Sequence, residues 1–216
     1  MFDIRELEKL LGYEFSNKDL LKTALTHSSF SHIHGGQNYQ RLEFLGDSIV
    51  DFLVAEELSK RYANADEGLL TKMRGAVVSA SPLSKIVQEK GYDKYLNIGA
   101  VNVSEKIRSD IFESICAAIY LDGGIDRARE FILKDLEEFI AVADKNCKND
   151  YKTALYEKFY DKNIEFKDVA KTGTEHRPIF EVELYIDGKF VAKASGESKK
   201  SAQQLCAKFM FDSKEN

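Results

Sequence analysis

Four acidic side chains at helical spacing are the residues of this sequence best suited to chemistry. Glu43 and Asp47 stand four residues apart in RLEFLGDSIV. Asp110 and Glu113 stand three residues apart in SDIFESICAAIYLDGG. Residues three or four apart share one face of a helix, so the two members of each pair lie together. Because a carboxylate among apolar residues is costly unless something pairs with it, this negative charge needs an offsetting partner.

A divalent metal ion would be that partner if the two helices lie side by side. Each acidic face continues into residues that turn inward, which are Val50, Val54, Ala117 and Tyr120. Four converging carboxylates suit a hard cation such as Mg²⁺ or Mn²⁺. A site of this kind can bind a phosphate oxygen and activate a water for in-line attack. The alternative is that both pairs lie on solvated helix faces, and the spacing alone leaves this open.

The elements that must position these acids are predicted to be helices. Asn38 can cap a long helix that runs to about Tyr62, and Ser104 or Glu105 can open a second helix that ends at DGG. Apolar residues recur at helical spacing in both segments. In the first segment they are Leu42, Leu45, Ile49, Phe52 and Leu53, and in the second they are Ile107, Ile111, Ile115 and Ile119.

Three further helices are predicted around these two. Asp66 can cap a helix across Leu69, Met73 and Val77, and Ser81-Pro82 can start another that Gly91 closes. A last helix is predicted from Arg127 to Ala143. Glycine and proline are scarce, and no strand pattern occurs. We therefore expect an all-α domain over residues 1–143.

The pattern changes after a polar segment at 144–150, which is interpreted as a short linker. Residues 151–216 predict the order helix, three strands, helix, with the strands in EFKDVAKTG, PIFEVELYI and KFVAKASG. Asp187-Gly188 between the last two strands is a strong hairpin signal. The expected fold is thus an all-α domain followed by a small α+β domain.

Charge and cysteine content restrict the class of protein. The net charge is −5, but residues 151–216 carry 12 Lys and Arg against 11 Asp and Glu, so the acidic excess of −6 lies in residues 1–150. Cys116, Cys147 and Cys206 are odd in number and lack C-x-x-C spacing, which argues against a disulfide framework or a cysteine zinc site. The sequence shows no membrane-spanning segment or signal peptide, and a reducing cytoplasm fits best.

RLEFLGDSIV closely resembles the signature of the ribonuclease III family, and SDIFESICAAIYLDGG and DEGLLTKMR resemble two further segments of the bacterial members. The resemblance covers nearly the whole chain. It implies a dimeric all-α endonuclease domain joined by a linker to a double-stranded-RNA-binding domain. It also implies Mg²⁺-dependent hydrolysis of both RNA strands, with Mn²⁺ as a substitute. The implied products carry 5′-phosphate and 3′-hydroxyl ends with a two-nucleotide 3′ overhang.

The resemblance also assigns roles to residues of the nuclease domain. Glu43, Asp47, Asp110 and Glu113 are implied to form the catalytic centre. Glu43 and Glu113 would bind the metal directly. Asp110 and Asp47 would complete the shell and position the water and the 3′-leaving oxygen, and Asp110 is also assigned to the metal site.

Two further residues match positions that act between subunits. Glu67 matches an acid that reaches the active site from the dimer partner, and Phe44 matches an aromatic that inserts into the other subunit. Plain core packing is the alternative for Phe44. Gln40 stands where many relatives have a glutamate, which weakens any charge contribution there.

The second domain resembles the fold that reads A-form RNA across two minor grooves and the phosphates between them. Lys199 and Lys200 would face phosphates at a helix start, His176 would contact a minor groove, and Thr153 and Glu157 match the first helix. A second departure is Tyr156 and Tyr160, where relatives often carry glutamine. This leaves base-pair preference at that groove open.

Parts of the sequence are compatible with two other functions and with one other metal site. A protein that binds structured RNA without cutting it would lack a catalytic carboxylate, and none of the four is missing. A hydrolase of small phosphorylated molecules would need no duplex-reading domain. His27, His32 and His34 lie close together in THSSFSHIHGG, but with no carboxylate or cysteine beside them a solvated loop is the favoured interpretation over a zinc site.

Overall fold

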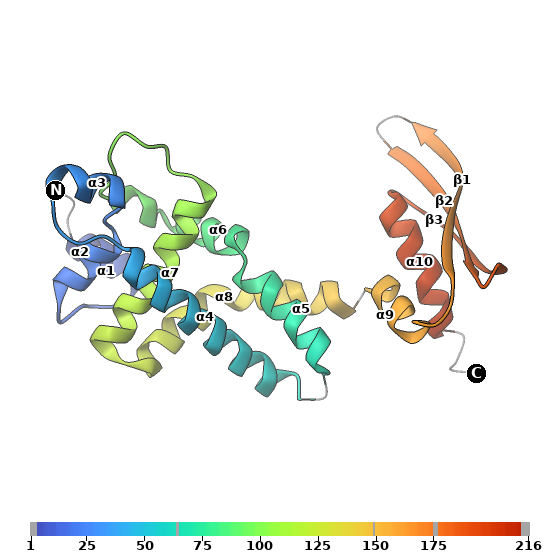
Figure 1. The fold of residues 1–216 in the computed structure, drawn as a ribbon, viewed down its shortest axis with the longest axis horizontal. Helices are drawn as coiled ribbons and strands as arrows, with labels where there is room; N and C mark the ends of the chain where they lie inside the picture. The colour runs from blue at the N-terminus through green and yellow to red at the C-terminus, as the bar shows by residue number, and fades with distance from the viewer. Residues whose placement is uncertain (1–3, 64, 149, 175–176, 213–216) are drawn as a thin grey trace. The chain divides into compact units, whose positions relative to one another are not determined.

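The computed structural model describes residues 4–63, 65–148, 150–174 and 177–212 (Figure 1). The chain divides into two compact units, Met1–Asp144 and Lys145–Asn216. No helix of the described residues is long and apolar enough to cross a membrane. Each unit has its own core and is described separately.

The first unit is helical, as predicted. Its elements are α1 (Ile4–Leu11), α2 (Lys18–Ala24), α3 (Ser28–His34), α4 (Gln40–Arg61), α5 (Glu67–Val78), α6 (Ala80–Lys90), the 3-10 helix η1 (Tyr92–Tyr95), α7 (Glu105–Gly123) and α8 (Ile125–Lys148). In the described part of this unit, the one β-type pairing is a single bridge between Thr26 and Asn97. Helix α7 is central, since it is buried almost continuously from Ile107 to Ile119 and packs against α4, α6 and α2.

Several helix ends follow the predicted caps. The Asp66 carboxylate accepts the N–H of Leu69 at 2.8 Å, and the Ser104 hydroxyl accepts the N–H of Ile107 at 3.2 Å. Gly91 ends α6 in the left-handed conformation, with φ of 71°, which glycine adopts without a Cβ penalty. The predicted start of α6 is wrong: the N-cap is Ser79, so Ser81 and Pro82 lie inside the first turn, where proline is tolerated because the N–H groups there have no helical partner.

Two features of the helices were not apparent from the sequence. Phe52 has helical spacing with the buried residues of α4, but its side chain is 55% exposed. Helix α8 begins at Ile125 and continues to Lys148, so it is longer than predicted and most of the segment at 144–150 is helical. A run of polar residues indicates exposure to solvent, and it does not by itself end a helix.

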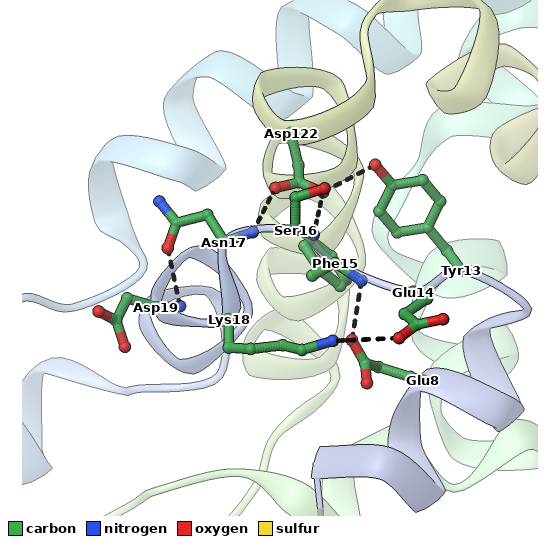
Figure 2. A network of polar contacts seen from close by, with 9 residues as sticks. All are labelled: Glu8, Tyr13, Glu14, Phe15, Ser16, Asn17, Lys18, Asp19 and Asp122. Atoms are coloured by element: carbon green, nitrogen blue, oxygen red, sulfur yellow. Dashed lines mark hydrogen bonds and ion pairs between the residues drawn. The ribbon is translucent and has the colours of Figure 1, made fainter.

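The loop between α1 and α2 is fastened to the end of α7 by one carboxylate (Figure 2). Asp122 accepts hydrogen bonds from the Tyr13 hydroxyl at 2.9 Å, the Ser16 N–H at 2.8 Å and the Asn17 N–H at 2.7 Å. Burial acts to raise the pKa of Asp122, but these three donors together hold it below its ordinary value. The network therefore fixes the N-terminal helices to the helix that carries Asp110 and Glu113.

Asp122→Asn is expected to lower the stability of the first unit by about 1–3 kcal/mol near neutral pH, because an amide cannot accept from all three donors as a carboxylate does. A carboxyl group with a depressed pKa stabilises the fold above its unfolded pKa, and this contribution is lost as the pH falls through the folded pKa. The difference in urea midpoint between parent and variant should therefore narrow between about pH 5 and about pH 3. A constant difference over that range would show that the charge of Asp122 is not involved.

The second unit has the predicted order of elements. These are α9 (Tyr151–Lys158), β1 (Ile164–Thr174), β2 (Arg177–Ile186), β3 (Lys189–Gly196) and α10 (Lys199–Asp212). The strands form an antiparallel sheet in the order β1-β2-β3. Asp187 and Gly188 both have positive φ and join β2 to β3 in a two-residue turn, as the sequence predicted.

The core of this unit lies between the sheet and the two helices. Leu155 of α9, Val182 and Leu184 of β2, and Ala202 and Cys206 of α10 are fully buried. Cys116 in the first unit is buried as well, so both described cysteines are small core residues with free thiols. The side chain of Cys147 lies outside the described residues.

Candidate metal centre and RNA-binding residues

The acidic residues are brought together where helices α4 and α7 pack closely against each other. A Cβ added to Gly46 would stand 1.9 Å from the carbonyl oxygen of Glu113 and 2.5 Å from its carbonyl carbon. Real Cβ atoms do not approach backbone this closely, so only glycine allows the two helices to lie at this separation. Gly46 stands between Glu43 and Asp47 in the sequence. The close approach therefore places the acids of α4 against those of α7.

Three carboxylates converge at this crossing. Glu43, Asp110 and Glu113 each offer an oxygen, and these oxygens lie within 4.8 Å of one another. Asp110 is the most enclosed, at 6% exposed, and the buried Tyr39 hydroxyl donates a hydrogen bond to its Oδ2 at 3.4 Å. The arrangement agrees with the expectation that the two helices face each other with their acids inward.

Two other predicted acids lie outside this group of three. Asp47 is exposed, one helical turn beyond Glu43, although its charge still acts on Glu113. Glu67 is exposed at the start of α5, where its Oε1 accepts a hydrogen bond from the Thr71 hydroxyl at 2.9 Å. The role of Glu67 at the site of a partner subunit stays a prediction.

The electrostatics of the group fit a hard cation. Burial raises the pKa of Glu113 to about 8, and the nearby carboxylates of Asp47, Asp110 and Glu43 add to the shift. Burial also raises the pKa of Glu43, with Asp110 as the next cause. Glu113 has no ion-pair partner among the described residues. An all-oxygen donor set in which the acidic groups outnumber the basic ones is the environment that Mg²⁺ or Mn²⁺ prefers.

Sequence reasoning missed a basic residue in this centre. The Lys106 Nζ lies 2.8 Å from Asp110 Oδ1 and 3.4 Å from Glu43 Oε1, so it bridges α7 and α4. The hydrogen bond to Asp110 is the largest cause that raises the pKa of Lys106. The spacing of four residues between Lys106 and Asp110 could have revealed the first of these contacts. The contact with Glu43 depends on the packing of two helices and has no local signal.

The histidines do not form a metal site with these acids. His27 caps α3, because its Nδ1 accepts the N–H of Ser29 at 3.1 Å, and its ring meets that of Tyr39 edge to face. His32 and His34 lie exposed in the same helix. The expectation of a loop was wrong, since residues 28–34 are helical. Among the described residues, the one group of side chains suited to a metal is that of Glu43, Asp110 and Glu113.

Two residues beside the acids are open to solvent. Phe44 is 79% exposed in the single chain, which excludes the alternative that it belongs to the core. Gln40 is exposed in the first turn of α4. A large aromatic side chain is seldom this exposed on a monomer, and aromatic residues are enriched at protein interfaces.

The predicted RNA-binding residues lie at two places in the second unit. Lys199 and Lys200 are exposed at the start of α10, where the Ser198 hydroxyl accepts the N–H of Ser201 at 3.1 Å. Lys199 also forms an ion pair with Asp168 of β1, a contact that the sequence did not predict.

Helix α9 carries the other predicted group. The Thr153 hydroxyl donates to Asp150 Oδ2 at 2.7 Å, and Glu157 is exposed. Tyr156 of α9 and Tyr160, which follows the end of the helix, are exposed as well, Tyr160 at 87%. His176 lies outside the described residues.

Comparisons of the sequence and of the structure with known proteins identify the same family. A family model described as Ribonuclease-III-like matches residues 17–139, and one described as a double-stranded RNA binding motif matches residues 151–213. The chain is 38% identical to Ribonuclease 3 of Aliarcobacter butzleri over 98% of both chains, and 34% identical to Ribonuclease 3 of Listeria monocytogenes over 96% of both. The nuclease domain of ribonuclease III from Campylobacter jejuni superposes with a TM-score of 0.59 at 35% identity. That match covers 63% of this chain and 97% of the other.

Proposed function

The chain belongs to the ribonuclease III family, and from this premise we propose that it is a metal-dependent endonuclease of double-stranded RNA. The observation that carries the proposal is the convergence of Glu43, Asp110 and Glu113 at the crossing of α4 and α7. A nuclease needs this centre and a means of holding a duplex, and the second unit has the α-β-β-β-α order of a duplex-RNA reader.

Each residue of the centre has a proposed task. Glu43, Asp110 and Glu113 would hold Mg²⁺, with Mn²⁺ as a substitute; when bound, the ion would supply charge stabilisation at the phosphate and an activated water. Tyr39 orients the Asp110 carboxylate through its hydrogen bond. The exposed Asp47, beside the centre, would orient the attacking water. Gly46 keeps α4 and α7 close enough for carboxylates of both helices to bind the same ion.

Cleavage of both strands needs two centres related by symmetry, so the proposed active form is a homodimer. The proposed products carry 5′-phosphate and 3′-hydroxyl ends with a two-nucleotide 3′ overhang. Glu67 of one subunit is proposed to contribute to the site of the other. Family membership supports roles in ribosomal-RNA precursor processing and in mRNA maturation or decay in the cytoplasm.

Phe44→Ala is expected to weaken the proposed dimer about a hundredfold to ten-thousandfold. Each subunit loses one phenylalanine side chain, and burying one such side chain contributes about 1.5–3 kcal/mol. Light scattering over a micromolar concentration series would measure the change. Phe190→Ala, at an exposed phenylalanine of the second unit, serves as the control and should leave the dimer intact. A monomeric parent that still makes staggered cuts in both strands would contradict the proposal.

Lys199→Ala combined with Lys200→Ala is expected to weaken binding to duplexes of any sequence. Each lost phosphate contact should lower the slope of log affinity against log salt by about 0.7–0.9. Gel-shift titrations at several salt concentrations measure this slope, with Lys85→Ala in the first unit as the control. An unchanged slope would show that neither lysine contacts the RNA backbone.

Incubation of the protein with a long RNA duplex, with Mg²⁺ and with EDTA, tests the proposed function. Staggered products with 5′-phosphate ends are expected in the reaction with Mg²⁺ and not in the reaction with EDTA. Binding without cleavage in Mg²⁺ would instead support a duplex-binding protein that does not cut.

A further inference from the structure

Glu43, Asp110 and Glu113 form a cluster of three carboxylates. Among the described residues, Lys106 is the one that forms ion pairs with this cluster, and its partners are Glu43 and Asp110. Its Nζ lies nearer to Asp110, at 2.8 Å, than to Glu43, at 3.4 Å. Glu43 belongs to α4 and Asp110 to α7, so a single ammonium group offsets charge on both helices. This is the position and the role that a metal ion would take among the same oxygens.

The position of Lys106 in its helix gives no other reason for a basic residue there. It is the second residue of α7, after the N-cap Ser104. The N-terminus of a helix carries partial positive charge and favours acidic side chains, so a lysine in the first turn is unfavourable for the helix. The two carboxylates are therefore what holds this ammonium group in place.

The ammonium group can also leave without unfolding the site. The Lys106 side chain is 75% exposed, whereas the Asp110 side chain is 9% exposed. Ion pairs of exposed lysines are weak, and a lysine side chain has four rotatable bonds that allow it to turn into solvent. The carboxylates remain fixed by their helices, while the ammonium group is free to exchange.

We propose that Lys106 is a resident counter-ion of the carboxylate centre, which a divalent cation displaces, so that this residue sets the metal affinity of the site. The inference rests on the proposed function, because it takes the three acids as the metal site. In the metal-free protein Lys106 limits the repulsion between α4 and α7. When a metal ion binds, the ammonium group must give up both ion pairs, which lowers the net affinity for the ion.

The test is the dissociation constant for Mn²⁺ and for Mg²⁺ alone, measured without RNA by calorimetry and by the rise in melting temperature. Lys106→Met keeps the length and helix propensity of the side chain and removes its charge. It should bind metal about five- to thirtyfold more tightly than the parent, since two exposed ion pairs no longer have to be broken. Its metal-free form should melt at a lower temperature than the parent.

Three matched variants make the result specific. Lys106→Arg keeps the cation and should stay within about threefold of the parent. Lys85→Met removes a lysine of similar exposure that pairs with Glu89 in α6, and should leave metal affinity unchanged. Glu113→Gln reports the metal site itself and should bind metal much more weakly.

The possible outcomes distinguish a failure of the counter-ion role of Lys106 from a failure of the proposed metal centre. Equal or weaker metal binding by Lys106→Met, with a parent that binds better than Glu113→Gln, overturns the counter-ion role alone. Equal binding by the parent and Glu113→Gln overturns the metal centre and the counter-ion role with it.

Discussion

Glu113→Gln is expected to reduce RNA cleavage by several orders of magnitude while leaving duplex binding close to that of the parent. The substitution keeps the size of the side chain but replaces a carboxylate with a neutral amide, which is a poorer metal ligand. Activation of the attacking water and stabilisation of the leaving oxygen both depend on this centre. The RNA-binding residues proposed in α9 and α10 are untouched, so binding should persist.

Single-turnover cleavage and a gel-shift titration on the same duplex separate these two effects. Glu138→Gln, at an exposed position of α8, is the charge-matched control and should cleave like the parent. Raising the Mn²⁺ concentration is expected to restore part of the rate of Glu113→Gln. Near-normal cleavage by Glu113→Gln would remove this residue from the catalytic centre.

Gly46→Ala is expected to lower both stability and cleavage, by forcing α4 and α7 apart. The new methyl group would stand 1.9 Å from the carbonyl oxygen of Glu113, and the obstacle is backbone, which cannot rotate away as a side chain can. Overpacking of this kind costs about 1–3 kcal/mol or more. The shift separates Glu43 from Asp110 and Glu113, so cleavage should fall further than the loss of folded protein explains.

Gly75→Ala in α5 is the matched control for this prediction. A Cβ at Gly75 would meet nothing within 4 Å. Alanine is favoured over glycine in a helix by about 1 kcal/mol, so Gly75→Ala should be neutral or stabilising. Urea unfolding and single-turnover cleavage of both variants give the comparison. A Gly46→Ala protein with parental stability and rate would contradict the close packing of α4 on α7.

The parts of the fold predicted from the sequence are those with a local signal. The spacing of Glu43 and Asp47, and of Asp110 and Glu113, together with the apolar periodicity around them, predicted two helices with acids facing inward. The structure brings Glu43, Asp110 and Glu113 together but leaves Asp47 exposed. Polar caps such as Asp66 and the Asp187-Gly188 turn are also local, and the structure places helix starts and the hairpin accordingly.

The parts that were missed depend on contacts between distant segments. The need for glycine at Gly46 arises from the backbone of Glu113, and the pairing of Lys106 with Glu43 arises from the same helix crossing. The exposure of Phe52 depends on which elements surround α4. None of these facts has a signal within a few residues of the chain.

Glu43, Asp110 and Glu113 are proposed to form the metal centre. Anomalous X-ray diffraction from crystals of the full chain grown with Mn²⁺ tests this most directly, because the ion itself is located. The predicted result is an anomalous peak within about 2.0–2.3 Å of carboxylate oxygens from α4 and α7, with Lys106 turned away from it. A fully occupied Mn²⁺ elsewhere in the first unit, with no peak among these three residues, would contradict the account.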